Sequence, residues 1–339
     1  MATLSEVARL AGVTTATVSN VLRNPGKVKA STVKKVKEAI AATGYRPNLM
    51  ARALAEGRSS MIAMVLPSIT NPFYPEFVRV AERVARQRDF FLMVCNTDEK
   101  AEIGHAYLQQ IAGTLADGVL ILHTGMGMSE IQELRGRRSP IVLASEENGM
   151  ANGSDMPQVV VDFELAGQIA AKHLVELGHR HFGMIIGRGC GGYHSERLKG
   201  FKDVLTAAGI GFADEDIAYV EDTVVGGHDA AIELVSRHSE LTAIFCTNDL
   251  LAFGAMQALA DRKIRVPQDI SVSGVTDIQL AQDIRPALTT VSLRIDEIAK
   301  LSIGLLLDLV ENPDHQPTVV QVPPPQLIVR DSTGPCRPD

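Results

Sequence analysis

Apolar positions over the first 22 residues recur every three or four residues, which is the spacing of one buried helix face. Thr3 and Glu6 have the spacing of a capping box, so the sequence predicts a first helix that begins there and ends at Gly12. Thr14 is predicted to cap a second helix that runs through Leu22. Two short helices separated by a glycine-containing turn match the helix-turn-helix pattern.

A third helix completes this N-terminal segment, which we call the head (residues 1–46). An Asn-Pro-Gly turn at residues 24–26 precedes Ser31, which is predicted to cap the helix, and Gly44 is predicted to end it. The apolar positions expected to pack between the three helices are Leu4, Val7, Ala8, Ala11, Val18, Val21, Val33, Val36 and Ile40.

From Ser60 onward, short apolar runs alternate with longer stretches of helical period. This alternation predicts an α/β fold with parallel sheets covered on both faces, and nine or more strands predict two lobes. Ligands of such sheets bind beyond the carboxyl ends of the strands, and two lobes add a cleft between them. The predicted strands span residues 61–66, 90–94, 118–122, 141–144, 159–161, 182–186, 243–246, 271–275 and 289–293. The predicted helices include residues 77–88, 165–177, 197–208 and 250–262.

Charge is distributed unevenly along the chain. Residues 1–58 contain ten Lys and Arg and three Asp and Glu, a formal charge of +7. The remainder therefore carries −14, because the whole chain carries −7. A small basic head on a large acidic body favours a polyanion such as nucleic acid as the partner of the head, whereas an ordinary solvated surface would not concentrate charge in this way.

The cysteines and the N-terminus indicate the compartment. Four scattered cysteines without a C-x-x-C pair predict neither a disulfide framework nor a zinc site, and they fit a reducing environment. No stretch approaches the roughly 18 uncharged apolar residues of a membrane helix, and the N-terminus lacks the apolar core of a signal peptide. We therefore expect a cytoplasmic protein.

The outward side of the second predicted helix carries small and polar side chains that suit close approach to a DNA major groove. Asn20 can hydrogen-bond an adenine edge through both amide atoms, while Ala16 and the Thr15 methyl group can contact a thymine methyl group. Hydroxyl groups and the helix N-terminus suit phosphate oxygens. The alternative is that these residues only cap and solvate a helix. The predicted DNA-contacting residues of this helix are Thr14, Thr15, Ala16, Thr17, Ser19 and Asn20.

Several motifs follow one another in order along the chain. The head contains SEVARLAGVTTATVSNVL, and GYRPNLMARALA follows it. Further motifs are NPFY at 71–74, ADG at 116–118, ELGH at 176–179, RLKGF at 197–201, FCTND at 245–249, VPQD at 266–269 and PALTT at 286–290. This order, which covers nearly the whole chain, resembles the lactose/galactose-repressor (LacI/GalR) family of bacterial transcriptional regulators.

The resemblance implies a periplasmic-binding-protein-like body of two lobes with a small-molecule cleft. The implied domains are a helix-turn-helix domain at residues 1–46, a hinge helix and linker at 47–59, and a ligand-binding and dimerisation domain at 60–339. Lobe 1 is expected over about 60–161 and 291–322, and lobe 2 over about 162–290 and 323–339.

Residues 48–55 resemble the hinge helix of the family. The segment follows Pro47 and is too short to form a stable isolated helix, so we expect it to fold only when two copies pack together on DNA. Leu54 matches the leucine that the family inserts into the minor groove, where it opens a base step and bends the duplex. Asn48 and Arg52 of the same segment are also predicted to contact DNA. The alternative is an ordinary linker.

The resemblance also assigns residues to the ligand cleft. Phe73 and Tyr74 would supply an aromatic wall for an apolar ring face. Arg197 matches the family's cleft arginine, whose fork suits paired hydroxyls or a carboxylate, and Asn248 matches a polar contact from the second lobe. The alternative is that Phe73 is a core residue and Asn248 a turn former. With two residues that follow the strand 118–122, the predicted ligand-contacting set is Phe73, Tyr74, His123, Thr124, Arg197, Asn248 and Thr276.

One cleft position departs from the family. The family usually has an aspartate two residues after the glycine of the strand at 271–275, and this chain has Thr276 there. Loss of a carboxylate removes a repulsive charge, and Arg197, with Arg188 and His194 expected nearby, makes the cleft better suited to an anion. We therefore expect a sugar acid, such as a gluconate or ketogluconate, as the effector. A neutral sugar or a nucleoside stays open as the alternative.

Signals of enzyme chemistry are weak. Residues 187–192 satisfy G-x-G-x-x-G, but a dinucleotide site needs an acidic residue about 20 positions later, and Glu221 lies too far along. His179 and His181 lack a third ligand at metal spacing. Asp249 is expected to cap the following helix rather than act as a base. No enzyme activity, cofactor or metal is therefore expected.

The main prediction is a ligand-responsive regulator, a repressor of carbohydrate catabolism genes that binds operator DNA. A sugar-binding transport component would share the two lobes but would need a signal peptide and no basic head. A cytosolic sugar-modifying enzyme would need a catalytic constellation. We expect a two-fold homodimer on a pseudo-palindrome because one head reads only a half-site. No leucine heptad follows residue 329, so no tetramer is expected.

Overall fold

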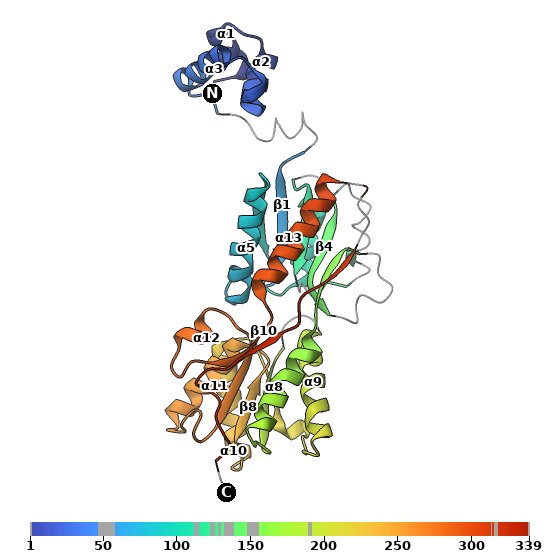
Figure 1. The fold of residues 1–339 in the computed structure, drawn as a ribbon, viewed down its shortest axis with the longest axis vertical. Coiled ribbons are helices and arrows are strands. Elements are labelled where there is room, and N and C mark those ends of the chain that lie inside the picture. The colour runs from blue at the N-terminus through green and yellow to red at the C-terminus, as the bar shows by residue number, and fades with distance from the viewer. Residues whose placement is uncertain are drawn as a thin grey trace. The chain divides into compact units, whose positions relative to one another are not determined.

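Two compact units make up the chain, Met1–Ser59 and Ser60–Asp339 (Figure 1). The computed structural model describes residues 2–46, 58–111, 115–122, 126–127, 130–131, 139–147, 156–188, 192–312, 314 and 318–337. The first unit contains the head. We call the second unit the body.

The head contains three helices packed around one small core. They are α1 (Leu4–Ala11), α2 (Thr15–Arg23) and α3 (Ala30–Thr43), with a short 3-10 helix η1 (Pro25–Lys27) before α3. Val7, Val18 and Val36, one from each α-helix, have no exposed surface. The three helices therefore bury the apolar faces that their sequence pattern predicted.

Two of the three predicted helix caps are confirmed. The Glu6 backbone N–H donates to Thr3 Oγ1 at 3.3 Å, and the Thr3 N–H donates to Glu6 Oε2 at 2.7 Å, which completes the capping box. Thr14 Oγ1 accepts the Thr17 backbone N–H at 3.2 Å. The prediction for Ser31 is wrong, because the cap position lies two residues earlier, at Lys29, which makes no side-chain bond to the helix end.

The body contains two six-stranded sheets, each made mostly of parallel strands. The sheet of lobe 1 has the order β11-β5-β4-β3-β1-β2, and that of lobe 2 has the order β12-β10-β9-β8-β6-β7. Only β12 runs antiparallel among the described pairs, against β10. The lobe 1 strands are β1 (Met61–Leu66), β2 (Phe91–Asn96), β3 (Gly118–Leu122), β4 (Ile141–Glu147), β5 (Gln158–Val161) and β11 (Val319–Gln321). The lobe 2 strands are β6 (Phe182–Gly187), β7 (Ile217–Val220), β8 (Ala243–Cys246), β9 (Ser271–Thr276), β10 (Thr289–Ser292) and β12 (Gln326–Ile328).

Helices cover both sheets. Lobe 1 has α5 (Phe73–Gln87), α6 (Ala101–Ile111) and α13 (Ile295–Glu311). Lobe 2 has α8 (Phe163–Glu176), α9 (Tyr193–Ala207), η2 (Asp214–Asp216), α10 (Val224–Arg237), α11 (Asp249–Asp261) and α12 (Leu280–Asp283). Although more than 200 residues separate them, α13 packs beside α5 (Figure 1). Arg88, which follows α5, donates to Asp308 of α13 at 2.7 Å and also pairs with Glu311.

Two helices that border the cleft begin one turn earlier than predicted. The sequence pattern placed the start of α5 at Phe77 and that of α9 at Arg197, and the structure places them at Phe73 and Tyr193. In α5 the reason is local, because Asn71 Oδ1 accepts the Phe73 N–H at 3.1 Å and supports the first turn. The side chains of these first turns are therefore presented on helices rather than on loops.

Helices α8 and α9 approach so closely that backbone touches backbone. A Cβ atom added to Gly200 would lie 2.0 Å from the carbonyl oxygen of Glu164, and one added to Gly167 would lie 2.0 Å from the carbonyl oxygen of Arg197. Neither atom belongs to a flexible side chain, so the helices themselves would have to move apart. This contact fixes the backbone of α9 at Arg197.

We expect Gly200→Ala to lower the free energy of unfolding by about 2–3 kcal/mol, because the added methyl group forces α8 and α9 apart. Gly304→Ala is the matched control, since Gly304 lies inside α13 with no atom within 4 Å of the added Cβ. The control should stabilise the protein by about 0.5–1 kcal/mol through helix propensity. Urea denaturation of both variants checks the prediction, and equal effects would contradict it.

Candidate functional site

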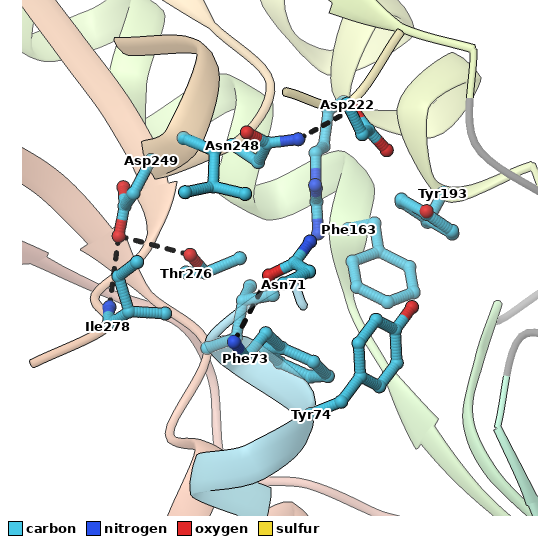
Figure 2. A pocket seen from close by; sticks show the side chains of 13 residues that line it. Asn71, Phe73, Tyr74, Phe163, Tyr193, Asp222, Asn248, Asp249, Thr276 and Ile278 are labelled. Carbon is cyan, nitrogen blue, oxygen red and sulfur yellow. Dashed lines mark hydrogen bonds between the residues drawn. The ribbon is translucent and has the colours of Figure 1, made fainter. Parts of the chain in front are cut away.

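A pocket lies between the two lobes of the body, where the strands of both sheets end. It encloses about 430 Å³ of space, including the part open to solvent. Figure 2 shows its side chains converging from α5 of lobe 1 and from α8, α9, α11 and the end of β9 in lobe 2. The lining residues are Asn71, Phe73, Tyr74, Phe163, Tyr193, Arg197, Asp222, Asn248, Asp249, Leu250, Thr276, Ile278 and Leu293. This is the position that the topology of parallel sheets favours for ligands.

Arg197 supplies a buried positive charge to this pocket. Its side chain is packed between two aromatic rings, with the guanidinium carbon 4.9 Å from the Phe163 ring centre and 5.0 Å from that of Tyr193. Nη1 donates to the Thr247 carbonyl at 2.5 Å, while Nε is buried without a hydrogen-bond partner. Among the described residues no carboxylate forms a direct ion pair with Arg197. Burial lowers the pKa of the guanidinium to about 10, while the charges of Asp222 and Asp249 oppose that shift. The group remains a cation at neutral pH.

Asp222 brings a carboxylate into the same pocket. Its Oδ2 accepts from His194 Nε2 at 3.0 Å, and its Oδ1 accepts from Asn248 Nδ2 at 2.7 Å (Figure 2). Burial lowers the pKa of His194, so this ring is neutral at pH 7 and does not cancel the charge of Asp222. Sequence reasoning missed Asp222, because its role depends on partners 26 and 28 residues away.

Asn248 and Asp249 both line the pocket, and Asn248 also has the capping role that the sequence assigned to Asp249. Asn248 is the residue that caps α11, since its Oδ1 accepts the Leu251 N–H at 2.9 Å, and the prediction that Asp249 caps this helix is wrong. Asp249 is buried and accepts from Thr276 Oγ1 at 3.0 Å and from the Ile278 N–H at 3.0 Å. It also accepts from Thr290 Oγ1 at 2.6 Å. Burial raises the pKa of Asp249 to about 7.

The hydroxyl of Thr276 therefore has a structural partner. A carboxylate at this position would lie within hydrogen-bonding distance of the Asp249 carboxylate, and two adjacent carboxylates repel each other unless they share a proton. Thr276 also has a positive φ of 123°, and the next residue, Asp277, has a φ of 58°. The loop after β9 is thus held in a strained backbone conformation by the side chain of Asp249.

The structure brings five of the seven residues predicted for the ligand cleft into this pocket. They are Phe73, Tyr74, Arg197, Asn248 and Thr276. His123 and Thr124 lie outside the described residues. Arg188, expected near the pocket, is exposed and is not part of its lining, and His194 acts on the pocket through Asp222. Sequence reasoning missed Phe163 and Tyr193, whose rings enclose Arg197.

The head presents the predicted DNA-contacting residues on α2. Thr14, Thr15, Ala16 and Asn20 are exposed, and Thr17 and Ser19 are half-buried. The hydroxyls of Thr14 and Thr17 lie 2.9 Å apart at the start of the helix. This exposed side is opposite the buried positions of α2, Val18 and Val21. Asn48, Arg52 and Leu54 lie outside the described residues.

A helix-turn-helix head followed by a two-lobed body with a pocket between the lobes defines a class of DNA-binding protein that responds to a small molecule. Residues 3–48 match the model of bacterial regulatory proteins of the lacI family, and residues 171–333 match a periplasmic binding protein-like domain. Over the described residues, no helix is long and apolar enough to cross a membrane, and no cluster of three or more His, Cys, Asp or Glu has a metal-binding arrangement.

Known proteins align with almost the full length of the chain. It is 34% identical to the HTH-type transcriptional regulator DegA of Bacillus subtilis (strain 168), over 98% of each chain. It is 32% identical to the ribose operon repressor of Escherichia coli (strain K12), over 96% of this chain and 98% of the relative. The structure of the transcriptional regulator CelR–cellobiose complex superimposes with a TM-score of 0.73 at 27% identity, covering 98% of this chain and all of that one. The chain belongs to the lacI family of bacterial regulatory proteins.

The raised pKa of Asp249 predicts a pH dependence of stability. The folded protein holds a proton on Asp249 that the unfolded chain, with a pKa near 3.8, releases. The stabilisation from this proton is present below about pH 4 and is lost as the pH rises through about 7. Between pH 5 and 8, the free energy of unfolding of wild type should therefore fall by on the order of 2 kcal/mol more than that of Asp249→Asn.

Urea denaturation at a series of pH values measures this difference. Asp214→Asn is the control, because the Asp214 side chain is 95% exposed, and its pH profile should run parallel to that of wild type. A constant difference between wild type and Asp249→Asn across this pH range would show that Asp249 is ionised throughout.

Proposed function

We propose that this lacI-family regulator is a repressor of carbohydrate catabolism genes that releases operator DNA when a sugar acid of the gluconate or ketogluconate class binds between its lobes. The observation that carries the choice of effector is the buried guanidinium of Arg197, whose Nε has no hydrogen-bond partner. The protein would act in the cytoplasm, where such metabolites arise.

A buried cation without a direct ion pair favours an anionic ligand. Removal of a charge from water costs several kcal/mol unless an opposite charge compensates it. The direct contacts of Arg197 are one carbonyl and two aromatic faces, and its Nε has no hydrogen-bond partner. Asp222 and Asp249 act on its charge without direct contact. A carboxylate can accept two parallel hydrogen bonds from a guanidinium fork, which a single sugar hydroxyl cannot do.

The other polar groups of the pocket suit the hydroxyls of such a ligand. Asp222 can accept hydrogen bonds from hydroxyls, and the amide of Asn248 holds it in place. The rings of Phe73 and Tyr74 offer apolar surface to the carbon chain or ring of the ligand. Among the residues predicted to contact the ligand, Phe73, Tyr74, Arg197, Asn248 and Thr276 are thus proposed as effector contacts.

The alternative effector is a neutral sugar or a nucleoside. Asp222 favours it, because the negative charge of Asp222 opposes that of a sugar acid. The names of relatives agree with this alternative as well, since one is a ribose operon repressor and another was solved as a cellobiose complex. A sugar acid would place a carboxylate against Arg197, whereas a neutral sugar or a nucleoside would place uncharged groups there.

The head is proposed to read DNA through the exposed side of α2. Asn20 and Ala16 would contact base edges in the major groove, while Thr14 and Thr17 contact phosphates. Residues 48–55 would fold as a hinge helix in the complex, with Leu54 inserted into the minor groove. Asn48 and Arg52 would contact the same groove.

A homodimer is the proposed binding form, because two heads are needed to read a pseudo-palindrome. The edge strand of lobe 1, β2, supports this proposal. Phe91 is 61% exposed and Val94 is 40% exposed on β2. An exposed apolar edge strand in a monomer is prone to pair with another chain, so a partner subunit would stabilise it.

Arg197→Ala should weaken gluconate binding by about 2–5 kcal/mol, because the carboxylate loses the one Lys or Arg partner that the described lining of the pocket offers. Binding of glucose, the uncharged parent sugar, should change by less than about 1 kcal/mol. Isothermal titration of the full chain with both sugars measures the two effects. Arg197→Lys is the matched control, and it should retain part of the gluconate affinity because the charge is kept and the fork is lost.

A wild-type protein that binds glucose or a nucleoside more tightly than gluconate would contradict the sugar-acid proposal and favour the alternative. Thr276→Asp is less suitable for this comparison, because the new carboxylate would lie against Asp249 and disturb the loop after β9 whichever ligand is used.

Asn20→Ala should weaken binding to a selected operator duplex by about 1–3 kcal/mol and leave binding to a scrambled duplex unchanged, because the amide contacts a base edge. Fluorescence anisotropy with duplexes selected from a random pool by the full chain measures both affinities. Ser31→Ala is the control, since Ser31 is exposed on α3 and caps no helix. An equal loss on both duplexes would assign Asn20 to the phosphate backbone instead.

A further inference from the structure

A hydrogen bond joins helix α5 of lobe 1 to the loop that precedes α12 of lobe 2. Glu76 Oε1 accepts the backbone N–H of Gln279 at 2.8 Å, between residues 203 positions apart in the sequence. The two elements lie next to each other where the lobes meet (Figure 1). The bond therefore crosses from one lobe to the other.

The Gln279 end of this bond belongs to a loop that is fixed to lobe 2. Asp249 accepts hydrogen bonds from Thr276 and from the Ile278 N–H. Arg330 donates to Asp277 at 2.7 Å, with both side chains mostly buried. Residues 276–278 are thus each held by a side chain of lobe 2. Gln279 is therefore fixed to lobe 2, and its bond to Glu76 restrains the whole lobe and not only the loop.

The Glu76 end of the bond lies beside the pocket wall. Glu76 is three residues after Phe73 in the first turn of α5, a spacing that places both on one face of the helix. Phe73 lines the pocket, and so do Thr276 and Ile278 at the other end of the bond. The Glu76 carboxylate is partly buried, and burial raises its pKa while the Gln279 N–H opposes that shift.

We infer that Glu76 is a positioning residue that holds the two lobes together at one side of the pocket and so sets how readily the pocket closes on an effector. The inference rests on the proposed function, in which the effector binds between the lobes. Glu76 itself does not line the pocket; it acts by keeping Phe73 and the loop at 276–279 at a fixed separation.

The Glu76–Gln279 hydrogen bond has a carboxylate as its acceptor. A hydrogen bond with a charged acceptor is stronger than one between neutral groups, and partial burial protects it from water. Loss of the bond shifts the lobes toward separated arrangements, and the apparent affinity for an effector falls with the fraction of molecules that remain competent to bind it.

Amide hydrogen exchange of the full chain tests the inference without any ligand. In Glu76→Ala, exchange should accelerate by about five- to twentyfold at Gln279 and also at Phe73, Tyr74 and Ile278, whose N–H groups lie at the pocket. Glu76→Gln keeps an acceptor oxygen and should remain within about threefold of wild type. Glu82→Ala is the matched control, because Glu82 lies on the same helix and pairs only with Arg86 one turn later among the described contacts.

Titration with gluconate adds a second measurement. Its Kd should rise in Glu76→Ala by about the same five- to twentyfold factor and stay unchanged in Glu82→Ala. Faster exchange confined to Gln279, with the other pocket amides as in wild type, would overturn the inference, since the bond would then be only local. Equal acceleration in Glu82→Ala would overturn it too, because the effect would then reflect weakening of α5. If gluconate fails to bind wild type, the sugar-acid proposal is wrong, and the exchange pattern still decides the role of Glu76.

Discussion

The buried guanidinium of Arg197 is the group on which the arrangement of the pocket depends. It lies between the rings of Phe163 and Tyr193 and bonds only to the Thr247 carbonyl among its described partners. Its backbone is fixed because the α8–α9 contact at Gly167 leaves no space between the helices. A cation in a low-dielectric environment carries an unfavourable desolvation energy that nearby negative charge offsets. The pocket thus combines this buried cation with the carboxylates of Asp222 and Asp249, which act on its charge without forming a direct ion pair.

Hydrogen bonds between the Asp249 carboxylate and the hydroxyls of Thr276 and Thr290 hold another part of the pocket wall. Asp249 anchors the loop after β9, and that loop reaches lobe 1 through Glu76. Asp222, in contrast, is tied to His194 and Asn248 within lobe 2. The bonds of Asp222 therefore lie within lobe 2, whereas the loop held by Asp249 is bonded to lobe 1. A movement of the lobes relative to each other would directly change the bond between Glu76 and Gln279.

Much of this architecture was predictable from local patterns. Capping at Thr3 and Thr14 and the strand at Met61–Leu66 follow from residues close together in the sequence, and the structure agrees with each of them. These predictions succeeded because hydrophobic periodicity and capping act within one turn or one strand. The positions of Phe73, Arg197 and Asn248 at the pocket were predicted from the resemblance to the family, and these residues do line it.

The errors arose where distant contacts decide the outcome. Asp249 was expected to cap α11, yet its partners Thr276 and Thr290 lie 27 and 41 residues away on neighbouring strands, and Asn248 caps the helix instead. Asp222 gave no signal because its role needs two partners that only the folded sheet brings to it. Ser31 does not cap α3 because the backbone carbonyl of Lys29 already begins that helix.

In the proposed function, a ligand bound around Arg197 controls the affinity of the head for DNA. The direct test measures the Kd of the full chain for its selected operator with and without saturating gluconate, and its Kd for gluconate with and without saturating operator. Thermodynamic linkage requires the two ratios to be equal. The account predicts one common factor of about fivefold or more, with gluconate weakening operator binding. Operator affinity that is the same with and without bound gluconate would contradict it.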